Sequence, residues 1–284
     1  MNKKVTGAVV LAGALGLFTG VVSAGSARLS GTIEVMEASE NTYTYVGPLA
    51  ERNWGDIAEV CDDGLRQSPV RLRPQRGRGG FDAPGDDPII VDYEPSQPFE
   101  IENLGSTIEF PQISDSNISI GGVTYDLLQF HIHADSEHTI RGKSYPLEIH
   151  FVHLNAEGNA AVLGVMVDEG DENEAIASTF GSPREFAQLI PGGDRTLLKF
   201  DAIEFDPSTL LPEGTATYRY TGSLTTPPCS EIVDWYVYEQ PIEMSEEQLE
   251  VLTDAVAGLS TVGPQGRNDR KLQDLEGREI LLVD

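Results

Sequence analysis

Hydrophobic and polar residues alternate along two stretches near the middle of the chain, and each stretch predicts a β-strand. In residues 127–133 every second side chain from Gln129 onward is polar, so a strand there would have one polar and one apolar face. The polar face would carry Gln129, His131 and His133, and the apolar face Leu128, Phe130 and Ile132. Two imidazoles would therefore point the same way, one pleat apart.

The second stretch, residues 147–154, has the same period of two. One face would carry Glu148, His150 and Val152, and the other Leu147, Ile149, Phe151 and His153. If the two strands are neighbours in one sheet, His131, His133 and His150 can converge on one point.

Apolar runs elsewhere predict further strands at 99–102, 106–110, 160–167, 197–205, 216–224 and 232–239. Helices are few. The clearest covers residues 245–257, with Ser245 as N-cap, Gln248 completing a capping box and Gly258 as the stop. A shorter helix is expected at 183–189. Many strands and few helices predict a mainly β protein with a single domain.

All five histidines of the chain lie between residues 131 and 153. Three neutral imidazoles without a fourth protein ligand are typical of a catalytic zinc site, which keeps one position open for water. Gln129 and Glu148 lie two residues from His131 and His150, so each is expected to hydrogen-bond its neighbour's second ring nitrogen. His138 and His153 are interpreted as hydrogen-bonded structural residues, since His153 would face away from His150.

The segment 136–152 also matches a family motif at every specified position, from Ser136-Glu137-His138 to Glu148-Ile149-His150-Phe151-Val152. Through it the chain resembles the α-class carbonic anhydrases of the bacterial, exported type, over residues 43–283. The resemblance implies a twisted, mostly antiparallel sheet of about ten strands, with one Zn²⁺ at the floor of a cone-shaped cleft. It also implies reversible hydration of carbon dioxide to bicarbonate and a proton, by attack of zinc-bound hydroxide.

The resemblance assigns roles to residues outside the two strands. Thr225 would accept a hydrogen bond from the zinc-bound hydroxide and donate its own proton to Glu137. Asn268 and Tyr45 would support the site. The carbon dioxide pocket would be lined by Val152, Val162, Leu224, Thr226, Val233 and Trp235. For the apolar members of this group, plain core packing is the compatible alternative.

One position departs from the family pattern. Many members carry a histidine in an Asn-x-Gly-His stretch, where it transfers the proton from zinc-bound water to solvent. The matching run here is Asn103-Leu104-Gly105-Ser106. Serine has no pKa near neutrality, so Ser106 cannot carry out this transfer. Turnover is therefore expected to be limited by proton release and to depend on external buffer.

The N-terminus reads as a secretory signal peptide, residues 1–24, with Lys3 and Lys4 before an uncharged apolar run and a small-residue cleavage site at Ala24. Residues 25–42 are predicted to form a flexible segment, and 43–284 the α-carbonic anhydrase domain. The protein is thus expected to be exported, to the periplasm or beyond, with no membrane span after cleavage.

The charge of the chain is strongly negative, with 46 acidic against 19 basic residues and a net charge of −27. Such a chain will not bind nucleic acid through its phosphates. The expected binding partners are the small molecules carbon dioxide and bicarbonate. The sequence does not decide between a monomer and a homodimer. The two cysteines, Cys61 and Cys229, are expected to form a disulfide in an oxidising compartment, and the resemblance supports that pairing.

Two other functions are alternatives. A catalytically silent family member could act as a binding module, but such members typically lose a zinc-binding histidine, and all three are present here. A purely structural zinc protein would need a fourth protein ligand. The sequence offers no candidate for that ligand.

Overall fold

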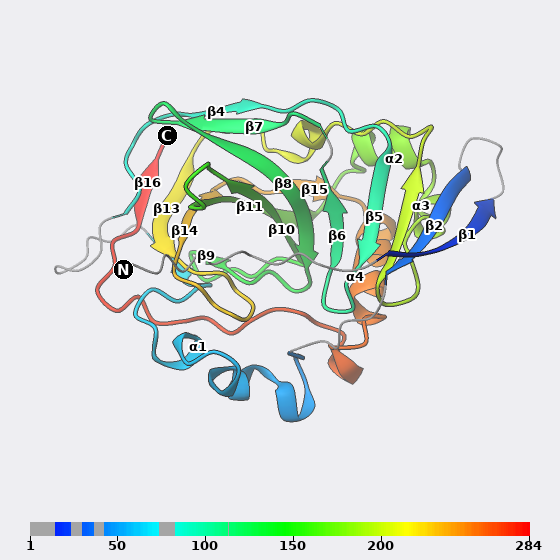
Figure 1. Cartoon of the computed structure of the whole chain (residues 1–284). Coiled ribbons are helices and arrows are strands. Elements are labelled where there is room, and N and C mark those ends of the chain that lie inside the picture. The colour runs from blue at the N-terminus through cyan, green and yellow to red at the C-terminus, as the bar shows by residue number, and fades with distance from the viewer. Residues whose placement is uncertain (1–14, 24–29, 37–42, 74–82, 113) are drawn as a thin grey trace, which may run out of the picture.

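A twisted sheet of 14 strands forms the centre of the molecule in the computed structural model (Figure 1). The structure describes residues 15–23, 30–36, 43–73, 83–112 and 114–284, with side chains from Tyr43 onward. Along its main path the strands follow the order β1 (Leu15–Ser23), β2 (Ser30–Met36), β12 (Thr196–Phe200), β5 (Phe99–Asn103), β6 (Ile108–Pro111), β8 (Val123–His133), β10 (Leu147–Leu154), β11 (Ala160–Glu169), β14 (Val233–Tyr238), β13 (Thr217–Gly222) and β16 (Leu281–Val283).

Three short strands join the sheet beside this path. They are β4 (Ile89–Asp92), β7 (Asn117–Ile120) and β15 (Ile242–Met244). Neighbours in the sheet are antiparallel except where β11 pairs with β14 and β15. A separate parallel pair joins β3 (Arg71–Leu72) to β9 (Thr139–Ile140). The mainly β prediction is confirmed, and the sheet has more strands than the about ten that the resemblance implied.

Two of the additional strands lie in the N-terminal region. β1 falls inside the predicted signal peptide, and β2 falls inside the segment predicted to be flexible. Residues 25–42 were expected to be a flexible segment. Instead, β2 pairs with β12 along residues 32–35, so this part of the segment is a strand. The sequence Thr-Ile-Glu-Val at 32–35 is rich in β-branched residues, which favour extended backbone. Residues 1–14, 24–29 and 37–42 lie outside the described residues, and the signal peptide stays a prediction.

The two predicted helices are confirmed. α4 (Glu246–Ala257) begins after Ser245, whose hydroxyl accepts the Gln248 N–H in a capping box. α3 (Pro183–Ala187) has a capping box between Ser182 and Glu185. The other helices are α1 (Val60–Asp63), α2 (Glu174–Phe180) and the 3₁₀ helices η1 (Gly47–Leu49), η2 (Glu51–Asp56), η3 (Pro207–Leu210) and η4 (Gly263–Gln265). Among the described residues, no helix has the length and apolar character needed to cross a membrane.

The two faces of the sheet have different neighbours. On one face, apolar side chains of β5, β8 and β10 pack with α2, α3 and α4 in the larger core, which includes Phe130, Ile149, Phe151, Phe180 and Leu252. A second cluster contains Val162, Val233 and Trp235, and Val152 packs against it. Val152 shares its face of β10 with His150, as the alternation predicted.

A β-bulge interrupts β8 just before the first histidine. Val152 pairs with Gln129 while His153 pairs with Leu127, so Leu128 has no partner on β10. The prediction that Leu128 faces the same side as Phe130 and Ile132 is therefore wrong. Leu127 is buried in its place and Leu128 is 43% exposed.

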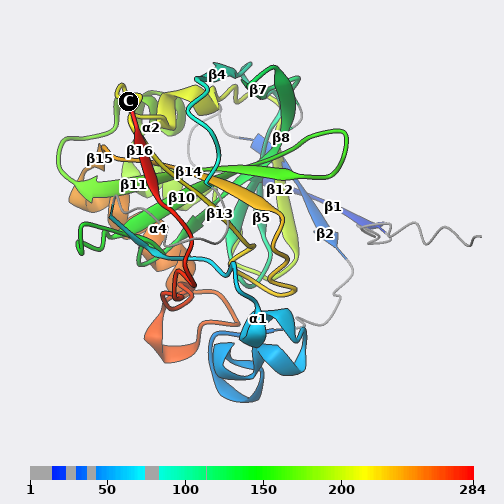
Figure 2. The ribbon, with the colours of Figure 1, turned by 90° about the vertical axis from the view of Figure 1, so that its left-hand side faces the viewer.

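The N-terminal helical segment and the C-terminal segment lie together at one end of the molecule, beside α1 (Figures 1 and 2). The Tyr45 N–H donates to the Thr261 carbonyl, and the Arg270 guanidinium donates to the Cys61 carbonyl. These contacts join the N-terminal segment to the C-terminal segment. The C-terminal segment in turn contacts β8, because the Asn268 side chain donates to the Ile132 carbonyl.

Candidate metal centre

The three predicted ligands converge. His131 on β8 pairs directly with His150 on β10, and His133 pairs with Glu148, so all four side chains share one face. The ligand nitrogens of His131, His133 and His150 lie within 4.8 Å of one another. His133 and His150 are both 1% exposed.

Each ring binds an acceptor through one nitrogen and turns the other nitrogen inward. The His131 Nδ1 lies 2.9 Å from Gln129 Oε1, the His133 Nδ1 lies 2.9 Å from the Asn268 carbonyl, and the His150 Nε2 lies 2.8 Å from Glu148 Oε1. Since all three partners are acceptors, these nitrogens carry the protons. The remaining nitrogens, Nε2, Nε2 and Nδ1, then present lone pairs to one another.

The inward nitrogens of His131 and His133 are only 3.1 Å apart. Two lone pairs at that distance repel, so this contact is not a hydrogen bond. A cation between the rings would convert the repulsion into coordination. The residues present therefore fit a metal ion.

The imidazoles also have the protonation state that a metal requires. Burial lowers the pKa of His133 to about 4, and burial together with the neighbouring rings lowers the pKa of His131 well below its usual value. Burial also lowers the pKa of His150. Neutral imidazole is the metal-binding form, so no proton has to be displaced at neutral pH.

Glu148 connects the centre to a buried polar chain that the sequence did not predict. Besides His150, it accepts the backbone N–H of His138 at 2.8 Å and His138 Nδ1 at 2.7 Å. His138 Nε2 lies 2.6 Å from the Tyr220 hydroxyl, which donates to Ser68. Burial alone would raise the pKa of Glu148, but His138 and His150 outweigh it and hold that pKa well below the usual range. Direct hydrogen bonds leave no space for a metal between His138 and Glu148.

Asn268 holds the end of β8 through its side-chain amide. Its side-chain oxygen accepts the Ala134 N–H, and its amide nitrogen donates to the carbonyls of Ser106 and Ile132. Asn268 thus contacts both His133, through its backbone carbonyl, and Ser106, through its side chain. Ser106 is 7% exposed.

Glu137 is buried between His133 and the C-terminal segment. Its Oε1 accepts the Arg270 N–H at 2.8 Å, while its Oε2 makes no hydrogen bond to any described residue. Burial raises the pKa of Glu137 to about 7, opposed by His150, by Arg270 and by the nearby Thr225 hydroxyl. The Thr225 hydroxyl is close enough to Glu137 to lower its pKa, while Oε2 has no hydrogen-bond partner among the described residues, so the bond from Thr225 stays a prediction.

Apolar residues that were predicted to line the carbon dioxide pocket pack together beside His150. Val162 pairs with Val152 on one side and with Trp235 on the other. The Trp235 ring lies 4.8 Å from the His150 ring, centroid to centroid. Val233 and Leu224 belong to the same apolar cluster.

The structure differs from the expectation that Tyr45 supports the site. Tyr45 packs edge-on against Trp54 and borders a surface pocket. The hydroxyl of Tyr43 instead contacts Ser106 and Thr226, and these contacts oppose the rise that burial causes in its pKa. Chain spacing alone could not distinguish the two tyrosines, because each is positioned by tertiary packing on Trp54.

The disulfide between Cys61 and Cys229 is formed, as predicted. Both cysteines pack with Trp54, and the Cys229 N–H donates to the Thr226 carbonyl at 2.9 Å. The bond therefore holds the Thr225–Thr226 loop against the N-terminal segment.

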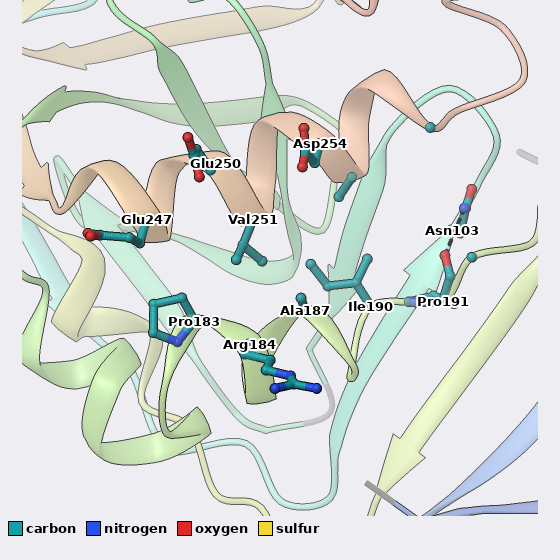
Figure 3. A pocket seen from close by; sticks show the side chains of 13 residues that line it. Asn103, Pro183, Arg184, Ala187, Ile190, Pro191, Glu247, Glu250, Val251 and Asp254 are labelled. Carbon is teal, nitrogen blue, oxygen red and sulfur yellow. Dashed lines mark hydrogen bonds between the residues drawn. The ribbon is translucent and has the colours of Figure 1, made fainter.

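A groove between α3 and α4, with a volume of about 410 Å³, lies elsewhere (Figure 3). Glu247, Glu250 and Asp254 line its α4 side, and Arg184 projects from α3. None of the predicted site residues borders it. The histidine cluster, not this groove, is the candidate active site.

Comparisons with known proteins agree with this site. The family model described as eukaryotic-type carbonic anhydrase matches residues 49–283. The carbonic anhydrase of Neisseria gonorrhoeae is 34% identical over 242 residues, which cover 84% of this chain and 86% of that protein.

Solved structures give the same result. The α-carbonic anhydrase of Photobacterium profundum superposes with a TM-score of 0.70 and 34% identity, covering 84% of this chain and 99% of that one. The α-carbonic anhydrase of Thermovibrio ammonificans, solved with the inhibitor sulfanilamide, has a TM-score of 0.71 and 35% identity, covering 85% and 99%.

Proposed function

The chain belongs to the eukaryotic-type carbonic anhydrase family, and from that membership we propose that His131, His133 and His150 hold a zinc ion used for reversible hydration of carbon dioxide. The family is zinc-dependent and acts on carbon dioxide and bicarbonate. The observation that carries the assignment to these residues is the convergence of three imidazole lone pairs, each fixed by an acceptor on the opposite ring nitrogen.

A zinc ion held by these residues would supply a Lewis acid that lets water ionise near neutral pH, a behaviour for which carbonic anhydrase itself is the reference example. The chain contributes orientation. If the Thr225 hydroxyl donates to the orphaned Oε2 of Glu137, its oxygen can only accept from the open position of the site. In that arrangement both carboxylate oxygens of Glu137 would accept a hydrogen bond.

The apolar cluster supplies a place for the uncharged substrate. Val152, Val162 and Trp235 form a wall beside His150, where carbon dioxide would lose little solvation and water would be excluded. Bicarbonate carries a charge, so the same wall disfavours the product and promotes its exchange for water.

Proton release is the step for which this chain lacks the usual group. Ser106 takes the place of the shuttle histidine, and Tyr43 and Asn268 contact it. Neither hydroxyl group has a pKa near neutrality in its ordinary state. We therefore propose that external buffer removes the proton.

Export is part of the proposal. Lys3 and Lys4 followed by an apolar run support a signal peptide. The Cys61–Cys229 disulfide supports an oxidising compartment, since such bonds are rare in the cytosol.

Metal removal and replacement test the proposal. Protein stripped with a chelator should hydrate carbon dioxide no faster than a protein-free blank in stopped flow. Activity should return in proportion to added zinc and reach its plateau at one equivalent. Stoichiometric zinc uptake without hydration would favour the binding-module alternative, and hydration without zinc would contradict the proposal.

A further inference from the structure

A second pocket lies at the edge of the small β3–β9 sheet, away from the histidines. It has a volume of about 420 Å³ and is bordered by Arg71, Arg73, Leu272, Gln273, Asp274 and Leu275. This size lies within the range of about 300–1,000 Å³ that is usual for small-molecule sites. None of these residues was assigned to the metal centre.

Arg71 and Arg73 stand out because, in a strongly acidic chain, neither has a partner among the residues that the structure describes. Both are exposed, on either side of the fully buried Leu72, and neither makes a hydrogen bond or ion pair to a described residue. Of the other described lysines and arginines, all except Arg184 bind a carboxylate, a carbonyl or another polar group. With 46 acidic residues in the chain, two adjacent unpaired guanidiniums mark this pocket.

The local backbone holds Arg73 next to a neighbouring turn. Its Nη2 lies 3.3 Å from the point where Gly142 would carry a Cβ, so a side chain there would crowd the guanidinium. Arg141 and Lys143 flank that glycine, but each is already paired, with Glu239 and Asp168. The free positive charge of this face therefore belongs to Arg71 and Arg73.

The remaining walls add acceptors and apolar surface. Gln273 uses its amide nitrogen on the Lys271 carbonyl, which leaves its side-chain oxygen free to accept. The Asp274 carboxylate also borders the pocket, and it opposes an anion unless the ligand offers it a donor. Leu272, 37% exposed, and the half-buried Leu275 provide a surface for carbon–hydrogen groups.

We propose that this pocket binds an anionic sugar. A guanidinium group donates two parallel hydrogen bonds to a carboxylate or a phosphate. The guanidiniums of Arg71 and Arg73 could therefore both bind the anionic group of one ligand. Sugar hydroxyls would donate to Asp274 and Gln273, and the apolar face of the ring would lie on the leucines. Uronates and sugar phosphates share this chemistry.

Nonspecific attraction of polyanions does not explain such a site. The net charge of −27 repels anions at long range, so binding has to come from direct contacts. The groove between α3 and α4 has a single arginine, Arg184, beside three acidic residues, so it lacks the pair of guanidiniums found here.

Titration calorimetry at about 0.15 M NaCl, where long-range repulsion is screened, tests the proposal. The probes are glucuronate, glucose 6-phosphate, inorganic phosphate and neutral glucose. We expect saturable binding of at least one of the two anionic sugars, with inorganic phosphate and glucose each at least tenfold weaker. Binding of glucuronate would identify the ligand class as uronates, and binding of glucose 6-phosphate would identify it as sugar phosphates.

The matched variants are Arg71→Gln/Arg73→Gln and, as control, Arg184→Gln, which removes an unpaired arginine elsewhere. The double variant should lose at least tenfold in sugar affinity, and Arg184→Gln should bind as the wild type does. Carbon dioxide hydration and the thermal midpoint should be unchanged in both, which shows that the fold is intact. No binding of either sugar, equal binding of inorganic phosphate, or unchanged affinity in the double variant would overturn the proposal.

Discussion

His131 and His150 face each other across β8 and β10 as directly paired residues, with ring centroids 5.2 Å apart. Because side chains alternate along a strand, a slip of one residue would send one ring to the opposite face. The candidate metal centre thus depends on the register of this strand pair. The bulge at Leu128 lies just outside the histidine segment and leaves that register intact.

Replacing Glu148 by Gln should weaken zinc binding about 10- to 100-fold, the usual effect of losing a carboxylate that supports a ligand histidine. A Gln oxygen in the place of Oε1 can still accept from both rings, but the NH2 group in the place of Oε2 cannot accept the His138 backbone N–H, and the negative charge beside His150 is lost. A competition titration with a chromophoric chelator measures the affinity. Glu157→Gln, in an exposed turn, is the control, and equal affinities in the two variants would show that Glu148 does not support the ligand.

Removing the Thr225 hydroxyl should lower kcat/KM for carbon dioxide hydration about 100-fold, the scale observed when one oriented hydrogen-bonding group is lost from an active site. Zinc affinity should stay unchanged, since Thr225 is not a proposed ligand. Thr225→Ala is compared with Thr225→Ser, which keeps the hydroxyl that Glu137 requires. If Ser is as impaired as Ala, the hydroxyl does not orient the reaction.

Imidazole added at fixed pH should raise kcat and leave kcat/KM unchanged, because buffer replaces the proton acceptor that Ser106 cannot provide. Stopped-flow hydration over a series of imidazole concentrations measures both constants, with sodium chloride keeping the ionic strength fixed. A kcat that does not respond means that another group carries the proton or that release is not limiting.

His153 should make folding stability depend on pH. Burial lowers its pKa to about 4, whereas an unfolded histidine titrates near about 6.5. Between these values the unfolded chain binds more protons, so stability decreases as the pH falls from about 6.5 towards about 4. The shift corresponds to about 3 kcal/mol.

Urea unfolding of the wild type and His153→Gln at about pH 7 and about pH 4.5 isolates this contribution. The variant loses the contacts to Tyr93 and Ala161 at both pH values, but it has no ring to protonate. Its deficit in unfolding free energy should therefore shrink at the lower pH. An equal deficit at both would contradict a buried neutral His153.

The strand pair and its histidines could be predicted because they depend on local periodicity. Period two set the faces of β8 and β10, and the nearest same-face neighbours, Gln129 and Glu148, contact their histidines as expected. The capping residues Ser245 and Gln248 likewise marked α4 from the sequence.

Features that depend on distant packing could not be predicted in this way. The exposure of Leu128 follows from one unpaired residue in a ladder, and the bond between His138 and Glu148 joins a loop to a strand. Tyr43 and Tyr45 differ only in how they pack around Trp54. The strand β2 has seven residues, Ser30–Met36, but it was not predicted because residues 25–42 are small and polar and show no clear periodicity as a whole.

The most direct test of the metal centre is the zinc content and carbon dioxide turnover of His133→Ala, measured beside His153→Gln. His133 carries an inward lone pair, whereas the His153 ring stacks on Tyr93, which also contacts Phe151 on the opposite face of β10. We predict that His133→Ala retains less than one zinc per chain after dialysis and hydrates carbon dioxide no faster than a protein-free blank. His153→Gln should keep one zinc per chain and full turnover. Full zinc content and turnover in His133→Ala would contradict the account.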